Sequence, residues 1–176
     1  LEEDAKGLRI FQKLVPEFFV ASSFSKNFGL YQDRVGALSV VTNDAEQASS
    51  VLSQLKICVR TSFSNPPAHG SALVTTILND NDLRSLWLAE LAHMRNRINK
   101  MRQSLVAGLT QQGATQDFSF ITRQKGMFSF SGLNPQQVER LREEHAVYIV
   151  GSGRINVAGI TPENLEGLCT AICAVL

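Results

Sequence analysis

Phe18-Phe19-Val20-Ala21 is a short apolar run that passes, after Ser22, into the polar stretch Ser23-Phe24-Ser25-Lys26-Asn27-Phe28-Gly29. The apolar run is typical of a buried strand, and the serine- and asparagine-rich stretch has the chemistry of a loop. Open α/β sheets bind ligands at the carboxyl ends of their strands, so Lys26 occupies a candidate ligand position. A lysine partly shielded from water there can lose its proton and attack carbonyl groups. Taken alone, a lysine in a polar loop is ordinarily a solvated charge, so position makes Lys26 only a candidate.

The first third of the chain alternates helical and strand patterns, as α/β proteins do. A helix is expected over residues 1–14, and a second strand is expected from Val35 to Val41. Asp44 then has the position of an N-cap for a helix that continues toward Arg60, before Ser64-Asn65-Pro66-Pro67 interrupts it.

Apolar residues recur at threes and fours from Asn79 to about Gly113, which predicts one long helix that joins two domains. A smaller α/β unit is expected after it, with helices begun by Asn134-Pro135 and Thr161-Pro162 and with strands at Met127–Ser131, Val147–Val150 and Arg154–Val157. We therefore predict two domains, residues 1–79 and residues 80–176.

The composition favours a soluble globular protein. The chain has 176 residues, 44% of them hydrophobic, and a formal net charge of +1. No block of like charges runs along it, which argues against binding to nucleic acid or to a membrane surface. Its apolar stretches are shorter than the roughly 18–20 residues that cross a bilayer.

The cysteines and histidines do not predict a metal site. Cys58, Cys169 and Cys173 match neither a disulfide framework nor a zinc site, and the three histidines are scattered along the chain. We expect Cys169 and Cys173 to be buried core residues of one helix, in a protein from a reducing compartment.

Arg34 lies at the start of the second expected strand, shortly after Lys26. A tight turn would bring its guanidinium near Ser23 and Lys26, and a fork of donors beside a hydroxyl is suited to a phosphate. A strand-end arginine in solvent is the alternative. Ser23-x-x-Lys26 also satisfies the S-x-x-K pattern of penicillin-binding proteins and β-lactamases, but their S-D-N and K-T-G tripeptides do not occur in the sequence.

Arg60 and Arg154 each stand among apolar or small residues with few acids nearby. Such arginines either extend along apolar surface to water or bind a carboxylate ligand. Arg154 follows Gly151-Ser152-Gly153 and begins an expected strand, so small residues would allow a ligand to approach it closely.

Four blocks of this sequence, in this order, resemble the aspartate and aromatic aminotransferases of pyridoxal-phosphate fold type I. They are Ser-Phe-Ser-Lys-Asn-Phe-Gly-Leu-Tyr (23–31) with Arg34-Val35-Gly36, Ser-Asn-Pro-Pro-Ala-His-Gly (64–70), Gly-Met-Phe-Ser-Phe-Ser-Gly-Leu (126–133) and Ser-Gly-Arg-Ile-Asn-Val-Ala-Gly (152–159). The resemblance extends over essentially the whole chain, and it implies pyridoxal 5'-phosphate as the cofactor.

By this resemblance, Lys26 matches the lysine that holds the cofactor as a Schiff base. Once the amino-acid substrate has displaced it, that lysine moves a proton between the substrate α-carbon and C4′ of the cofactor. Ser23 and Arg34 match ligands of the cofactor phosphate.

The resemblance also assigns substrate-binding residues. Arg154 matches the arginine that pairs with the substrate α-carboxylate, and Arg60 matches one that reaches from the neighbouring subunit to the side-chain carboxylate of aspartate or glutamate. Ser64 lies in a segment that crosses the dimer interface toward the partner's cofactor in the family. Phe128 matches an aromatic position near the substrate.

The resemblance implies the C-terminal part of the fold type I transferase fold: the end of the large cofactor-binding α/β domain, a long connecting helix and a small α/β domain. In the family, the preceding part carries an aspartate on the pyridine nitrogen, a tyrosine and an asparagine on the ring oxygen, and an aromatic residue stacked on the ring. We therefore expect the intact parent enzyme to be active and residues 1–176 alone to be inactive.

The expected activity is transfer of an amino group between aspartate or glutamate and a 2-oxo acid, by a ping-pong route in a homodimer with shared sites. Aromatic amino acids are the alternative substrates within the family. A catalytically inactive fragment or paralogue that serves as an interaction module is the alternative outside it. A cytoplasmic location is expected, with an organellar matrix left open.

Overall fold

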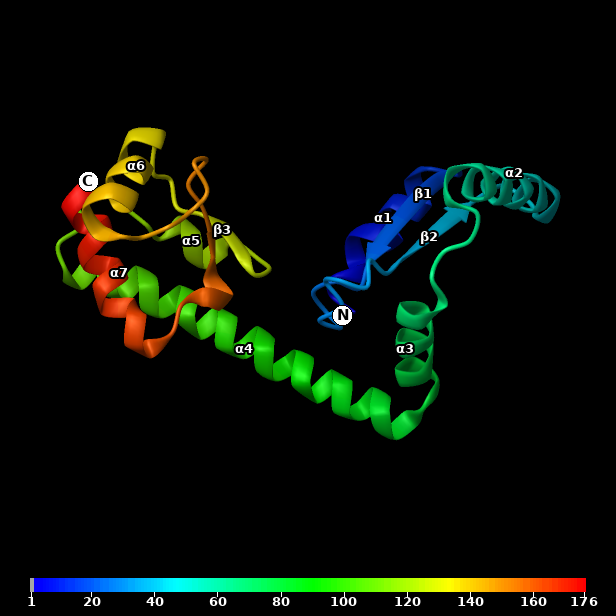
Figure 1. The fold of residues 1–176 in the computed structure, drawn as a ribbon, viewed down its shortest axis with the longest axis horizontal. Coiled ribbons are helices and arrows are strands. Elements are labelled where there is room, and N and C mark those ends of the chain that lie inside the picture. Colours follow the sequence, from blue (N-terminus) through cyan, green and yellow to red (C-terminus); the bar gives the residue numbers. More distant parts are fainter. Residues whose placement is uncertain (1) are drawn as a thin grey trace. The chain divides into compact units, whose positions relative to one another are not determined.

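The computed structural model describes residues 2–176, which divide into two compact units (Figure 1). The first unit extends to Trp87 and the second begins at Leu88. Within the described residues, each unit has one two-stranded antiparallel sheet. The long helix α4, Asn81–Gln111, begins in the first unit and continues in the second.

The first unit is built around the pair formed by β1 and β2. Its other elements are helices, and in chain order the unit contains α1 (Ala5–Leu14), β1 (Phe18–Ser23), β2 (Gly36–Val41), α2 (Ala45–Phe63) and α3 (Ala68–Asn79). The register pairs Phe18 with Val41 and Ser23 with Gly36, so the connection between the strands leaves from the Ser23 end. The expected strands are thus confirmed, but only Phe18 of β1 is buried, because β2 is the one strand paired with it among the described residues.

Helix boundaries in the first unit follow local chemistry. Asp44 accepts a hydrogen bond from the backbone N–H of Gln47, which confirms it as the N-cap of α2. At the other end of α2, Ser64 has a φ of 70°, and the two prolines follow. The expected helix over residues 1–14 is present from Ala5, and Leu1 lies outside the described residues.

Helix α3 was not predicted from the sequence, because its apolar and small residues lack the wide polar face of a surface helix. The long helix begins two residues later than expected, since the Asp80 carboxylate accepts hydrogen bonds from the backbone N–H groups of Asp82 and Leu83. This cap separates α3 from α4.

The second unit packs short strands and helices against the greater part of α4. Its further elements are α5 (Phe120–Arg123), β3 (Phe128–Phe130), α6 (Pro135–His145), β4 (Arg154–Asn156), the 3-10 turn η1 (Val157–Gly159) and α7 (Pro162–Val175). Asn134 and Thr161 each close a capping box, which confirms the predicted starts of α6 and α7.

The predicted strand Val147–Val150 is wrong. Val147 and Ile149 are partly buried against the core while Tyr148 and Val150 are exposed, so the segment has the alternation of a strand. It has no strand partner among the described residues, because the turn before Gly153 carries the chain directly into β4. An apolar run in the sequence therefore does not form a strand here, because it lacks a pairing partner within residues 2–176.

The hydrophobic core of the second unit lies between α4, α6, α7 and the β3–β4 pair (Figure 1). Leu105 and Leu109 of α4 are almost fully buried in it, as are Val157 and Cys169. Burial raises the pKa of the Cys169 thiol to about 11, so this cysteine is an unreactive core residue as predicted. Among the described residues, no helix is both long enough and apolar enough to span a membrane.

Candidate functional site

The loop that carries Lys26 emerges where β1 ends. Because Ser23 of β1 pairs with Gly36 of β2, everything between them lies at one end of the two-stranded sheet. Lys26 is exposed there, and its Nζ lies 5.2 Å from the centre of the Tyr31 ring. The side chain forms no ion pair with any described acid, so its amine is available to a ligand.

Aromatic contacts fix the backbone on both sides of Lys26. The indole N–H of Trp87 donates a hydrogen bond of 2.8 Å to the backbone carbonyl of Asn27. The Phe28 ring stacks on Trp87 at 4.6 Å and meets the edge of Phe24 at 5.5 Å. Sequence reasoning assigned Trp87 only to the long helix, since nothing in a single sequence connects it to a loop sixty residues earlier.

Two serine hydroxyls lie at the start of this loop. The Ser23 hydroxyl donates to the Ser25 hydroxyl at 3.1 Å and accepts from the Ser25 backbone N–H at 3.2 Å. Ser25 is buried, whereas Ser23 is exposed. Only Ser23 was predicted from the sequence, although the alternation Ser-Phe-Ser indicates a second polar side chain on the same side, at Ser25.

Arg34 adds a positive charge to the same end of the sheet. Its backbone has a φ of 53°, and its guanidinium donates one hydrogen bond of 3.0 Å, to the carbonyl of Tyr31. Among the described residues it has no carboxylate partner and no hydrogen bond to Ser23 or Lys26. The remaining donors of the fork are therefore free for an anion.

Helix α3 supports the segment around Arg34 through Gly70. This buried glycine faces Val35 so closely that a Cβ atom on it would lie 1.9 Å from Cγ2 of Val35 and 3.2 Å from Cβ of Asp33. A non-glycine side chain would thus displace the residues on both sides of Arg34. Sequence reasoning did not identify this contact, because it depends on the unpredicted α3.

Arg60 and Ser64 lie together at the C-terminal end of α2. The Arg60 guanidinium donates a hydrogen bond of 2.6 Å to the Ser64 hydroxyl, and both side chains are exposed. Ser64 has a positive φ of 70°, outside the helical region, so the chain leaves the helix at this point. The pair presents a guanidinium and a hydroxyl side by side.

In the second unit, Phe128 and Arg154 are neighbours on adjacent strands. The register places Phe128 opposite Asn156 and Phe130 opposite Arg154, and the Arg154 guanidinium lies 5.1 Å from the centre of the Phe128 ring. Arg154 is exposed and has no carboxylate partner among the described residues. The Phe128 ring thus orients the guanidinium of Arg154, while the N–H donors of the guanidinium remain free to bind a ligand.

Gly153, directly before Arg154, is required by the packing of the chain itself. Its φ is 76°, and a Cβ atom there would lie 2.7 Å from the Leu133 carbonyl oxygen. The Ser131 hydroxyl donates to the Gly153 carbonyl at 2.7 Å. Gly153 therefore fixes the start of β4.

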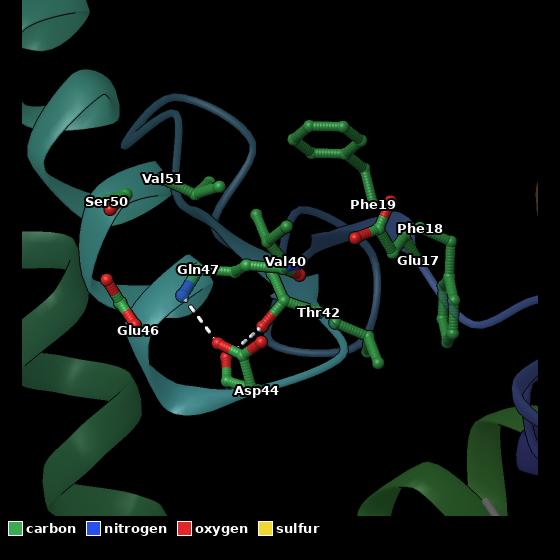
Figure 2. Close-up of a pocket in the computed structure, with 11 residues that line it drawn as sticks. Glu17, Phe18, Phe19, Val40, Thr42, Asp44, Glu46, Gln47, Ser50 and Val51 are labelled. Atoms are coloured by element: carbon green, nitrogen blue, oxygen red, sulfur yellow. Dashed lines mark hydrogen bonds between the residues drawn. The ribbon is translucent and has the colours of Figure 1, made fainter.

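A pocket of about 720 Å³ lies at the opposite end of the first unit's sheet, where β1 begins and β2 ends (Figure 2). Apolar side chains of both strands line it together with Glu17, Asp44 and Glu46. Figure 2 shows that Asp44 is engaged with Thr42 and Gln47 at the start of α2. None of the predicted site residues lines this pocket, and its carboxylates make it unsuitable for a phosphate.

Residues 2–176 contain no group of three or more histidine, cysteine, aspartate or glutamate side chains that could hold a metal ion. The sequence-predicted site residues supply an amine, guanidinium forks, hydroxyls and an aromatic ring. The structure brings Ser23, Lys26 and Arg34 to one sheet end, Arg60 to Ser64, and Phe128 to Arg154.

Comparison with known proteins gives consistent matches over the full chain. Residues 2–172 match the family model for aminotransferase class I and II. An aspartate aminotransferase of Salmonella typhi is 58% identical over 176 residues, which cover all of this chain and 44% of that protein. An aromatic-amino-acid aminotransferase of Pseudomonas aeruginosa is 50% identical over 175 residues, which cover 99% of this chain and 44% of that protein. The chain thus spans less than half the length of these relatives.

The fold has matches among solved structures as well. An aromatic-amino-acid aminotransferase from Burkholderia pseudomallei, covalently bound to pyridoxal phosphate, superposes with a TM-score of 0.95 at 51% identity. The match covers 99% of this chain and 44% of that one. At this identity the likeness extends to the order of elements and to the sequence that forms them.

Proposed function

This chain belongs to the family of class I and II aminotransferases, and from that premise we propose that it is part of a pyridoxal-phosphate-dependent aspartate aminotransferase. The polypeptide that contains it transfers an amino group between aspartate or glutamate and a 2-oxo acid. The observation that carries the proposal is the end of the β1–β2 sheet, where the connection between the strands carries two serine hydroxyls and a lysine and an arginine that have no carboxylate partner among the described residues.

These residues fit pyridoxal 5'-phosphate by their chemistry. The phosphate needs a positive charge and donors, which the guanidinium of Arg34 and the hydroxyls of Ser23 and Ser25 supply. The amine of Lys26 would hold the cofactor covalently through its aldehyde carbon. The bound cofactor supplies the electron sink that stabilises negative charge at the substrate α-carbon.

Lys26 would have a second task when its amine is not bonded to the cofactor. The free amine would then take a proton from the substrate α-carbon and return it on the cofactor side, and so would act as both base and acid. The contacts of Asn27 and Phe28 with Trp87 support this task, because they fix the backbone from which the flexible lysine side chain extends.

Two guanidiniums support a dicarboxylate substrate. Arg154, held over Phe128, would bind the α-carboxylate through a forked pair of hydrogen bonds, and Arg60 would bind the side-chain carboxylate of the substrate held by a partner subunit. This assignment makes the enzyme a homodimer in which Ser64 and Arg60 lie at the shared site. Size measurement in solution tests the dimer.

The division into domains is part of the proposal. Residues 1–79 form the end of the large cofactor-binding domain, and residues 80–176 form the connecting helix and the small domain. The chain alone should not transaminate, because the groups that contact the pyridine ring lie in the preceding part of such an enzyme. Turnover of aspartate and 2-oxoglutarate by residues 1–176 with no complementing segment would contradict this.

The proposed compartment is the cytoplasm. All three cysteines are free, as a reducing compartment requires, although an organellar matrix would satisfy the same condition. Microscopy of the full-length protein with a fluorescent tag at its C-terminus distinguishes the two.

Aromatic amino acids are the second candidate substrates. The 50% and 51% identity to aromatic-amino-acid aminotransferases favours this candidate directly. The ratio of kcat/KM for aspartate to kcat/KM for phenylalanine decides between them, and Arg60→Leu should lower the aspartate value without lowering the phenylalanine value.

The test of the activity uses the full-length enzyme with Lys26→Ala, and with Lys56→Ala as control because Lys56 is exposed on α2. Wild type and the control should exchange amino groups between aspartate and 2-oxoglutarate at similar rates, whereas Lys26→Ala should lose at least about a thousandfold in kcat. A fully active Lys26→Ala variant would overturn the proposal in favour of a non-catalytic module or another chemistry.

A further inference from the structure

The β3–β4 pair has two different faces. Phe128, Phe130 and Arg154 are exposed, whereas Ser129 and Ile155, paired opposite each other, are buried. The exposed face therefore carries the proposed carboxylate site. The residues that pack against the buried face therefore set the position of the two strands, and with it the position of that site.

Arg102 of α4 contacts the buried face directly. Its side chain is only 2% exposed, yet no described carboxylate forms an ion pair with it. The guanidinium donates to the Gly126 carbonyl at 2.6 Å and to the Ser129 hydroxyl at 3.2 Å, with a further bond of 3.2 Å to the Asn99 side chain. Two of its three partners thus belong to β3 or to the residues that lead into it.

An arginine in this position costs stability. Burial lowers the pKa of the Arg102 guanidinium, although it stays charged, and a buried charge without an opposite charge depends wholly on its hydrogen bonds. A leucine or methionine on α4 would fill the same space without that cost. We therefore infer that Arg102 is present for its directional hydrogen bonds to β3, which an apolar side chain could not make.

Arg97, five residues earlier on α4, makes the corresponding contacts with the residues that follow the other strand. Its guanidinium donates to the carbonyl of Ala158 at 3.0 Å and to the carbonyl of Ile160 at 2.8 Å. Both carbonyls lie just after β4, in and beyond η1. The exit of β4 is thus attached to the same helix as β3.

We propose that Arg97 and Arg102 are positioning residues that hold β3 and β4 on α4, so that Arg154 and Phe128 are preorganised to bind the substrate α-carboxylate. This inference rests on the proposed function of Arg154. The two arginines do not touch the substrate. They act through the Ser129–Ile155 pair and through η1, which flank Phe128 and Arg154 in the sequence.

The experiment uses the full-length enzyme with bound cofactor and the variants Arg97→Met, Arg102→Met and Ser129→Ala. Arg95→Met is the matched control, because Arg95 lies on the same helix, is exposed, and bonds only to its neighbour Asn96. Succinate, a dicarboxylate with no amino group, is the probe, and its Kd is read from the change in cofactor absorbance. Cofactor affinity is measured in parallel.

We expect the succinate Kd and the KM for aspartate to rise about tenfold in Arg97→Met and Arg102→Met, as a displaced binding group predicts. A smaller rise is expected in Ser129→Ala. Arg95→Met should stay within about twofold, and Arg102→Lys should restore part of the affinity, because its ammonium still reaches one carbonyl. The cofactor Kd should change in none of them, since Lys26 and Arg34 belong to the other unit.

The proposal is overturned if succinate binds Arg97→Met and Ser129→Ala as tightly as wild type. It is also overturned if succinate and cofactor affinity fall together, which would indicate general destabilisation. These two variants decide the matter even if Arg102→Met fails to fold, because Arg97 is only half-buried and Ser129→Ala removes one hydroxyl. An Arg154→Ala variant with unchanged succinate binding would overturn the proposed function of Arg154 itself, and this inference with it.

Discussion

The two units differ sharply in how much of their apolar surface they bury. Every member of the main buried cluster, from Met101 to Val175, belongs to the second unit, whereas Phe18 and Val74 are the buried hydrophobic residues described in the first. Large apolar side chains stay exposed along α1, β1, β2 and α2 of the first unit, among them Leu14, Phe19, Leu38 and Ile57.

The proposed cofactor residues and the main hydrophobic core lie in different units. The proposed cofactor residues Ser23, Lys26 and Arg34 lie in the unit that has almost no core of its own, and the proposed α-carboxylate residue Arg154 lies in the unit that has one. Exposed apolar surface on this scale is typical of a region that packs against another protein segment or subunit. If the proposed roles hold, the cofactor residues of the first unit depend on whatever covers that unit, whereas Arg154 in the second unit depends on α4.

The largest expected contrast is between two leucine truncations in residues 1–176. Leu105→Ala removes a side chain with no exposure and should lower the free energy of unfolding by about 2–5 kcal/mol. Leu52→Ala removes a side chain that is 52% exposed and should change it by less than about 0.5 kcal/mol. Urea unfolding measures both, and equal losses would show that the first unit has a core comparable to the second.

A second contrast compares the two helix caps that the sequence identified. Asn134→Ala removes a capping box in the second unit and should cost about 1 kcal/mol in the same urea transition. Asp44→Ala removes the cap of α2 and should leave that transition in place, because the first unit adds little to cooperative unfolding. A loss of similar size from Asp44→Ala would mean that the units unfold together.

The smallest expected effect is on acid stability. Hydrogen bonds from the backbone and hydroxyl of Ser119 lower the pKa of Asp117, and the Arg140 guanidinium lowers the pKa of Glu144. Because folding depresses these pKa values, the stabilisation is present above the carboxyl pKa of the unfolded chain and is lost as pH falls through the depressed values. Asp117→Asn should reduce the fall of the second unit's Tm as the pH drops through the acid range. An unchanged dependence of Tm on pH would show that Asp117 does not contribute to stability.

Sequence reasoning identified the parts whose signal is local. Caps at Asp44, Asn134 and Thr161 were predicted because a single polar side chain determines each helix start. The Lys26 loop was identified from a strand followed by polar residues, and the family resemblance then specified the roles of its residues.

What was missed depends on contacts between distant segments. Trp87 on the Lys26 loop, Gly70 beneath Val35 and Arg102 beneath Ser129 join residues that are remote in sequence. The wrong strand at Val147–Val150 has the same cause, because pairing requires a partner that periodicity does not supply. Local chemistry thus selected the lysine and the arginines as candidates, the family resemblance added Ser64 and Phe128, and tertiary packing determined what holds these residues in place.

The central claim is that Lys26 holds the cofactor, and chemical trapping tests it most directly. The full-length enzyme is treated with pyridoxal 5'-phosphate and sodium borohydride, which reduces the bond between amine and cofactor to a stable one, and the digest is analysed by mass spectrometry. The account predicts one modified lysine, Lys26, on the peptide that contains Asn27 and Phe28. Stoichiometric modification of another lysine with Lys26 unmodified would contradict it.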